Sequence, residues 1–367
     1  MNVRDICNVL GEIAPLSLAA EWDNVGLLVG DGRAAVRKIL LCIDLTEKVL
    51  AEAVRVRAQM VMAYHPVIFK SVTRVTPEAA PMVFQAARRG IAVYSMHTAL
   101  DAAEGGTNDV LADVLDLHDR KPLDPARRTD RCKVVVFLPA EDLSSVAGAA
   151  FAAGAGVIGE YRGCSFIGHG VGTFYGSEHS NPAVGQAGRH EAAEEVRLEM
   201  IAPTGRVEDI RRAVRGVHSY EEPAIDVYPL LDAPAGLGLG RVGRLAKPAS
   251  LETLIRRVKR ALGVSRVLLA GDGKNAKRRI GVAAVAAGSA GSIWKSAAAA
   301  GATLYLTGEM RHHDALAAAE AGMSVVCVGH SHSERITLGR LAEALTARRP
   351  KLRVALAQSD RDPFEIL

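Results

Sequence analysis

The sequence predicts an α/β protein in which the N- and C-terminal segments build one domain around a mostly parallel sheet, with a smaller α+β domain inserted between them. Helical and β-rich segments alternate near both ends of the 367-residue chain. This alternation is typical of parallel sheets that helices cover on both faces. The middle of the chain differs, because long glycine-rich β segments alternate there with two helices, as in ferredoxin-like domains.

The first part of the chain, residues 1–128, carries the βαβ rhythm. We expect a loop at 19–31, helices at 3–13, 47–57, 82–89 and 108–117, and strands at 39–45, 60–65 and 91–97. A polar stretch with two prolines around 120–130 then marks a boundary. The apolar faces of the helices and the apolar strands together predict one layered core.

Two further parts follow that boundary. Residues 129–232 form the expected insert, with β segments at 133–139, 154–176, 196–203 and 225–231. The Pro- and Gly-rich stretch 230–240 marks the second boundary. Residues 233–367 return to the α/β rhythm, with strands expected at 266–270, 280–288, 304–309 and 324–330.

Composition excludes several classes of protein. Lys and Arg are scattered and the net charge is only +4, so nothing in the sequence indicates a nucleic-acid partner. The five cysteines are odd in number and contain no C-x-x-C pair, which favours reduced, buried thiols in the cytoplasm. The N-terminus lacks the pattern of a signal peptide, and no stretch is long and apolar enough to span a membrane.

Histidines follow four of the predicted strands. They are His65, His97, His330 and the pair His312 and His313. The carboxyl ends of parallel strands are where open α/β sheets place their ligands. His65 alone is more typical of a hydrogen-bonded structural histidine than of a metal ligand, so the grouping carries the argument.

Two of these histidines begin the same pattern, His-x-x-x-carboxylate. The pairs are His97 with Asp101 and His330 with Glu334, and this spacing places both side chains on one face of a helical turn. The alternative is a pair of capping boxes, in which Thr98 and Ser331 are the N-cap residues and Asp101 and Glu334 are their partners three residues later. Two such pairs, each directly after an apolar strand, favour metal binding over two coincidental caps.

His65, His97, Asp101, His330 and Glu334 therefore form the candidate ligand set. Three imidazoles and two carboxylates can hold two divalent ions if one carboxylate bridges them. Zinc is the first expectation, and iron and manganese are the alternatives because all three accept these ligands. Such a centre predicts a hydrolytic reaction.

The fourth histidine segment, TGEMRHH, suggests a supporting role. We expect His312 and His313 to orient ligands or to move protons, with Glu309 as a competing general base. The loop at 288–292 could also cradle an anion with its backbone amides, although short Gly/Ser turns are common. The pattern Gly238-x-Gly240-x-x-Gly243 matches a dinucleotide fingerprint but follows no strand, so we interpret it as a crossover between domains.

These motifs, in this order, resemble the GTP cyclohydrolase I type 2 family, which is also described as dinuclear-metal-centre proteins that form toroidal hexamers. The resemblance covers nearly the whole chain, and the middle part is similar to the PII-like insert of the long members. It rests on the segments 22–31, 64–69, 97–109, 307–316 and 329–334 and, for the insert, on 154–166, 170–174, 184–200 and 218–230.

The resemblance implies both an activity and an assembly. It places His65, His97, Asp101, His330 and Glu334 on the family's metal positions, whereas Tyr64 stands where many members have a second histidine. It implies attack of activated water on a guanine nucleotide, converting GTP to dihydroneopterin triphosphate and formate. It also implies a homohexamer capped by the PII-like insert. A hydrolase of other nucleotides or phosphoesters and a non-enzymatic, regulatory metal-binding scaffold are the alternatives.

Overall fold

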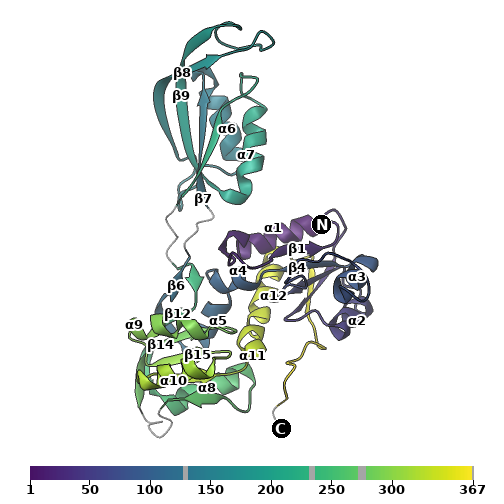
Figure 1. Cartoon of the computed structure of the whole chain (residues 1–367), viewed down its shortest axis with the longest axis vertical. Helices are drawn as coiled ribbons and strands as arrows, with labels where there is room; N and C mark the ends of the chain where they lie inside the picture. The colour runs from purple at the N-terminus through teal and green to yellow at the C-terminus, as the bar shows by residue number, and fades with distance from the viewer. Residues whose placement is uncertain (127–130, 231–235, 272–277, 366–367) are drawn as a thin grey trace. The chain divides into compact units, whose positions relative to one another are not determined.

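The structure is a computed structural model that describes residues 1–126, 131–230, 236–271 and 278–365 (Figure 1). Contacts divide the chain into a first unit, Met1–Ala126 with Ala233–Leu367, and a second unit, Arg127–Asp232. The domain boundaries expected at 128/129 and 232/233 lie outside the described residues. The chain is a mixed α/β protein, as the sequence predicts.

One sheet of the first unit is almost wholly parallel. Its strand order is β1-β4-β3-β2-β17, and only β1 runs antiparallel to its neighbour. The strands are β1 (Gly26–Val29), β2 (Lys38–Cys42), β3 (Met60–Ala63), β4 (Ala92–Ser95) and β17 (Arg353–Leu356). Helices α1 (Val3–Ile13) and α12 (Thr337–Arg348) pack on one face, and α2 (Glu47–Arg55) and α3 (Pro81–Arg88) on the other (Figure 1).

A second, mixed sheet completes the first unit. Its order is β13-β16-β15-β14-β12-β5, in which β14, β15 and β16 are parallel and the other pairings are antiparallel. The strands are β5 (Leu117–Lys121), β12 (Arg241–Ser250), β13 (Leu268–Ala270), β14 (Arg279–Ala286), β15 (Leu304–Thr307) and β16 (Ser324–Cys327). Helices α5 (Thr107–Leu115) and α8 (Leu251–Leu262) cover one face, and α9 (Trp294–Ala299) and α10 (His312–Glu320) the other.

The expectation of a single, mostly parallel sheet is therefore corrected to two sheets. The βαβ rhythm predicts that successive strands lie parallel, but it does not predict which strands share a sheet. β17, from the C-terminal end, pairs with β2, whereas β5, from the N-terminal part, pairs with β12. The sheet of N-terminal strands thus includes one strand from the C-terminal end, and the sheet of C-terminal strands includes one strand from the N-terminal part.

A buried ion pair joins α5, from the N-terminal part of the chain, to the start of β12, from the C-terminal part. The Arg241 side chain is almost fully buried, and its guanidinium donates to both carboxylate oxygens of Asp109 on α5, at 2.9 and 3.0 Å. It also donates to the carbonyls of Gly238, Gly240 and Ala103. A strand and not a helix follows these glycines, which excludes the dinucleotide-binding arrangement.

The second unit has the element order β-α-β-β-α-β of ferredoxin-like domains. Its antiparallel sheet has the order β10-β7-β9-β8, and two helices share the core with it. The elements are β7 (Arg131–Leu138), α6 (Leu143–Ala152), β8 (Ser165–Tyr175), β9 (His190–Pro203), α7 (Val207–Arg215) and β10 (Ile225–Pro229).

Some local expectations need correction. β1 lies inside the stretch 19–31, which was expected to be a loop, and β5 begins at the expected helix end and runs into the polar stretch. The strand expected at 225–231 ends at Pro229 in the structure, and Leu231 lies outside the described residues. Among the residues that the structure describes, every helix is too short or too polar to cross a bilayer.

Candidate metal centre

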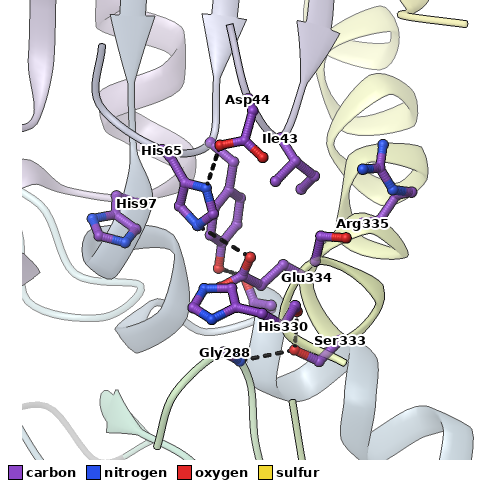
Figure 2. A network of polar contacts seen from close by, with 12 residues as sticks. Ile43, Asp44, His65, His97, Gly288, His330, Ser333, Glu334 and Arg335 are labelled. Atoms are coloured by element: carbon purple, nitrogen blue, oxygen red, sulfur yellow. Dashed lines mark hydrogen bonds and ion pairs between the residues drawn. The ribbon is translucent and has the colours of Figure 1, made fainter. Parts of the chain in front are cut away.

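Three histidines lie at the carboxyl ends of strands from both sheets of the first unit. His65 follows β3, His97 follows β4 and begins α4 (His97–Ala102), and His330 follows β16 and begins α11 (His330–Arg335). The ring centroid of His65 lies 5.3 Å from that of His97 and 5.4 Å from that of His330. The two sheets therefore direct their ligand-bearing edges toward one site (Figure 2).

Glu334 lies between two of these imidazoles. Its Oε2 is 3.2 Å from His65 Nε2, and its Oε1 is 3.2 Å from His330 Nε2. Ligand atoms of these three residues all fall within 4.8 Å of one another, a spacing at which one cation can contact all of them. The structure thus brings together three of the five predicted ligands (Figure 2).

Each of the three imidazoles has its Nδ1 beside a carboxylate. His65 Nδ1 is 2.9 Å from Asp44 Oδ1, and His97 Nδ1 is 2.8 Å from Asp23 Oδ1. His330 Nδ1 is 3.0 Å from Glu309 Oε1. A carboxylate on one ring nitrogen fixes the tautomer and leaves the other nitrogen free to bind a metal ion.

The charges around Glu334 stabilise one another. Burial lowers the pKa of His65, but its contacts with Asp44 and Glu334 outweigh burial and raise that pKa to about 10. The hydrogen bond to Glu334 raises the pKa of His330 to about 9. Burial opposes ionisation of Glu334, yet the two imidazoles hold its pKa below the usual value. Without a metal ion, the site balances its carboxylate with protonated histidines.

Asp101 and His97 line the same pocket, although neither belongs to the three-residue cluster. Burial and the nearby charge of Glu334 raise the pKa of Asp101 to about 6. The Tyr64 hydroxyl donates a hydrogen bond to Asp101 and lies 2.9 Å from Thr107 Oγ1. Burial raises the pKa of Tyr64 well above its ordinary value, so this residue is a neutral donor to Asp101.

The helix-cap interpretation of both His-x-x-x-carboxylate pairs is wrong. The N-cap residues are Met96 and Gly329, and neither cap has a side-chain hydrogen bond. Thr98 donates instead to Asp23 Oδ2, at 2.5 Å, and Ser331 donates to Asp362 Oδ2, at 2.6 Å. Asp101 and Glu334 are therefore not engaged in capping.

His97 has a strained backbone. Its φ is +31°, in the left-handed region that residues other than glycine rarely adopt. Such outliers cost on the order of 1–3 kcal/mol and gather at functional sites. Asp23 binds both the imidazole and the backbone amide of Thr98, so its carboxylate holds the start of α4 in this conformation.

The predicted supporting residues divide into two groups. Glu309 contacts His330, as described above, and is half-exposed. His312 and His313 are exposed at the start of α10, where their rings lie 5.4 Å apart. Among the described residues, no hydrogen bond or ion pair joins these two histidines to the pocket, so the structure does not bring them to the site.

The loop at 288–292 lies directly against the cluster. Gly288 has a φ of +65°, and a Cβ at this position would lie 2.6 Å from Glu334 Oε1. The Gly288 amide donates to Ser333 Oγ, at 2.8 Å (Figure 2). Its amide is therefore not available to an anion, but its missing side chain keeps the site open.

The donors fit a divalent cation. Glu334 Oε2 is buried, and no donor among the described residues meets hydrogen-bond geometry with it. Three imidazoles and two carboxylates line a pocket of about 650 Å³, within the range of small-molecule sites. Imidazole and carboxylate are ligands that zinc, iron and manganese share.

Two functional carboxylates are missing from the sequence-based prediction, Asp23 and Asp44. Asp44 lies two residues beyond β2, which ends at Cys42, whereas the strand expected at 39–45 runs past Asp44. The strand-end rule that found the histidines would have found Asp44 if the end of this strand had been predicted correctly. Asp23 had no such signal, since it reaches His97 across 74 residues of chain.

Fold and site together define an α/β protein with a candidate metal centre between the edges of two sheets. The chain belongs to the Duf34/NIF3 (NGG1p interacting factor 3) family, which matches residues 1–363. This match confirms the resemblance found in the sequence.

Relatives match along the whole chain. A Bacillus subtilis protein named GTP cyclohydrolase 1 type 2 homolog is 32% identical over 373 residues, covering 100% of this chain and 99% of its own length. A Mycobacterium tuberculosis protein of the same name is 35% identical, covering 94% of this chain and 92% of its own. The crystal structure of a Bacillus cereus protein related to NIF3 is 32% identical, with a TM-score of 0.78, and covers 100% of this chain and 99% of its own.

Proposed function

We propose that the first unit is a dinuclear, metal-dependent hydrolase that converts GTP to dihydroneopterin triphosphate and formate. The observation that carries this proposal is the set of three imidazoles, each with a carboxylate at Nδ1, grouped around the buried Glu334. The names of the relatives support the choice of a guanine nucleotide.

The five predicted ligands have different parts in this proposal. His65, His330 and Glu334 would hold one ion, because their ligand atoms already share one space. His97 and Asp101, on the same pocket, would complete the site for the second. Tyr64 would stay a hydrogen-bond donor to Asp101. Zinc is the proposed metal, with iron and manganese as alternatives.

Divalent ions at such a site lower the pKa of water and stabilise negative charge that develops on oxygen. The chain's own residues supply orientation and proton transfer. Asp23, Asp44 and Glu309 hold the Nε2 atoms toward the pocket. Glu309, which is half-exposed beside His330, is the proposed proton acceptor. A part for His312 and His313 in proton transfer stays a prediction.

The family resemblance also supports two proposals about architecture. The second unit would be a PII-like domain, which its β-α-β-β-α-β order supports. The whole chain would assemble as a homohexamer. Light scattering of the purified protein tests the assembly, since a hexamer of 38.8 kDa chains differs clearly in mass from a monomer or dimer.

The proposed activity is tested by metal content and turnover measured on the same sample. The purified chain should hold divalent metal, and with GTP and added Zn²⁺, Mn²⁺ or Fe²⁺ it should produce a fluorescent pteridine. Glu334→Gln should abolish both, whereas Glu343→Gln, an exposed substitution on α12, should change neither. Stoichiometric metal without turnover of GTP would contradict the proposed reaction. If no other nucleotide or phosphoester is turned over either, the regulatory scaffold is favoured.

A further inference from the structure

Two exposed aromatic rings stand at the pocket that contains the candidate metal ligands. Trp22 is 63% exposed and Phe69 is 56% exposed, yet both line this pocket. Their ring centroids lie 5.9 Å apart, with an angle of 57° between the ring planes. Large apolar side chains with this exposure lose contact with water when a ligand covers them, which makes them favourable contact surfaces.

A hydrogen bond joins the two loops that carry these rings. The Asn24 side chain donates to the carbonyl of Ile68, at 2.7 Å, and so joins the loop that carries Trp22 to the loop that carries Phe69. Trp22 is followed by Asp23, whose carboxylate contacts the imidazole of His97. The Trp22 ring also lies 5.9 Å from that imidazole. These contacts thus hold the loops that carry the aromatic pair beside the candidate metal ligands.

The pocket offers little countercharge for phosphate. Among the described residues that line it, none is Lys or Arg, and the titratable side chains are those of the candidate ligands. Its volume of about 650 Å³ is sufficient for a nucleoside. The side chains of this pocket are therefore suited to contact the planar, uncharged base of a nucleotide.

We infer that Trp22 and Phe69 form an aromatic platform that binds the purine base of the substrate next to the metal centre. This inference rests on the proposed function and names how that substrate is recognised. The base lies against the exposed side of the pair, because rings 5.9 Å apart already contact each other and leave no slot between them. Base stacking tolerates any planar heterocycle, so the platform provides affinity and the metal centre selects the reactive position.

The fluorescence of Trp22 gives a direct test on the full-length protein as purified. The chain has two tryptophans, and the other, Trp294, is buried. Titration with guanosine should quench the emission saturably, and ribose 5-phosphate should leave it unchanged. Trp22→Phe should remove the quenching while KM for GTP stays within about threefold, since a phenyl ring still stacks. Trp22→Ala should raise KM about tenfold or more.

Tyr161→Ala, at an aromatic residue of the second unit that is 76% exposed, is the matched control and should change neither signal. The platform is wrong if guanosine does not quench at concentrations that support turnover, or if Trp22→Ala leaves KM unchanged. It is also wrong if ribose 5-phosphate competes with GTP for binding as well as guanosine does. A third contradicting result is Trp22 emission that changes with protein concentration and not with guanosine, because this would place Trp22 in a subunit interface. Quenching by guanosine without turnover of GTP would support the platform and contradict the proposed function.

Discussion

Gly288 leaves open the space beside Glu334 that the proposed cation would occupy. Any side chain at this position would meet Glu334 Oε1 at 2.6 Å and would come within 3.5 Å of His330 Nε2. The neighbour Gly308 is similarly restricted, because a Cβ there would lie 2.6 Å from the Gly288 carbonyl oxygen. Two glycines therefore maintain the space in which the predicted ligands meet.

Gly288→Ala should abolish metal binding by His65, His330 and Glu334 while the chain remains folded. The physical reason is displacement of the Glu334 carboxylate, and metal analysis of the purified variant measures it. Gly90→Ala is the matched control, since Gly90 has a φ of +63° and open space around its Cβ position. The control should lose about 1 kcal/mol of stability through the backbone and should keep its metal. Equal metal content in both variants would contradict this reading of Gly288.

Asp44→Asn should weaken metal binding about 10- to 100-fold, because the amide no longer fixes and polarises the His65 ring. Competition with a chelator of known affinity measures the change. Asp31→Asn provides the comparison, as Asp31 is exposed and, in the described part of the chain, its side chain bonds only to Arg33. If the two variants bind metal with equal affinity, Asp44 does not orient His65 for a metal ion.

For single residues, the sequence predicted the position of a side chain where that position follows from the end of a neighbouring strand. His65, His97 and His330 directly follow strands, so their meeting at sheet edges could be predicted. The contact between Asp23 and His97 depends on how two distant loops fold together, and nothing local indicates it. His312 and His313 also follow a strand, but they begin a helix whose first turn is exposed.

At the scale of elements, helix α11 is held in place by the C-terminal segment that follows β17. The Arg335 guanidinium bonds to Asp360, whose carboxylate also accepts from the backbone amide of Ile43, at 2.7 Å. Ser331 bonds to Asp362. The C-terminal segment thus connects the helix that carries His330 and Glu334 to the end of β2.

Glu52, on α2, anchors the same segment. Its buried carboxylate accepts from the amides of Gln358 and Ser359 and from the Ser359 hydroxyl, at 3.1, 2.8 and 2.6 Å. Burial would raise the pKa of Glu52, but these hydrogen bonds outweigh burial and hold the pKa below 4.5. The resulting stability is present above about pH 4.5 and is lost as pH falls through the lower pKa of the folded state.

Glu52→Gln should therefore lower the free energy of unfolding by about 1–3 kcal/mol at pH 7. The difference from the unmodified chain should shrink below pH 4.5, where the carboxylate of that chain begins to protonate. Urea unfolding at several pH values measures this, with the exposed Glu343→Gln as the control. A difference that does not change between pH 7 and pH 3 would exclude the charge of Glu52 as its cause.

Sequence patterns predicted the strongly periodic elements well and the short edge strands poorly. The helix expected at 3–13 is found as α1, with the apolar period of a helix that packs on a sheet. β1, β5 and β17 were not predicted. Each lies at the edge of its sheet and is only partly buried, whereas the equally short β3 and β4 are buried throughout. Such strands form because a neighbouring strand supplies hydrogen bonds, and this neighbour is not visible in the local sequence.

At the scale of the whole molecule, all the candidate ligands and the aromatic platform come from the first unit. The second unit is inserted in the sequence between two short strands of the first unit, β6 (Asp124–Pro125) and β11 (Gly238–Leu239), which pair antiparallel. The amide of Ala126 donates to the carbonyl of Leu237, at 3.0 Å, so the chain enters and leaves the insert at neighbouring positions. Each unit also has its own apolar core.

Replacement of residues 127–236 by Asn-Gly should close this pair as a two-residue hairpin. The shortened chain should fold and should bind metal as the full chain does, because every proposed ligand is retained. Circular dichroism and metal analysis test this expectation. A folded product without metal would show that the second unit contributes to the site.

The division of the first unit into two sheets could not be predicted, although the mixed α/β class and the order of elements could. The ligand positions do not depend on this division, because they follow from the carboxyl ends of strands in either arrangement. For this reason the predicted positions of the histidines at strand ends do not depend on how many sheets the first unit contains.

The central claim is that His65, His97, Asp101, His330 and Glu334 hold two divalent ions. Crystals of the protein purified with its metal, measured at wavelengths on both sides of the absorption edges of zinc, iron and manganese, test it most directly. The account predicts two anomalous peaks in this pocket, one of them bounded by His65, His330 and Glu334. Well-ordered side chains at this site without an anomalous peak, in a sample shown by elemental analysis to contain metal, would contradict it.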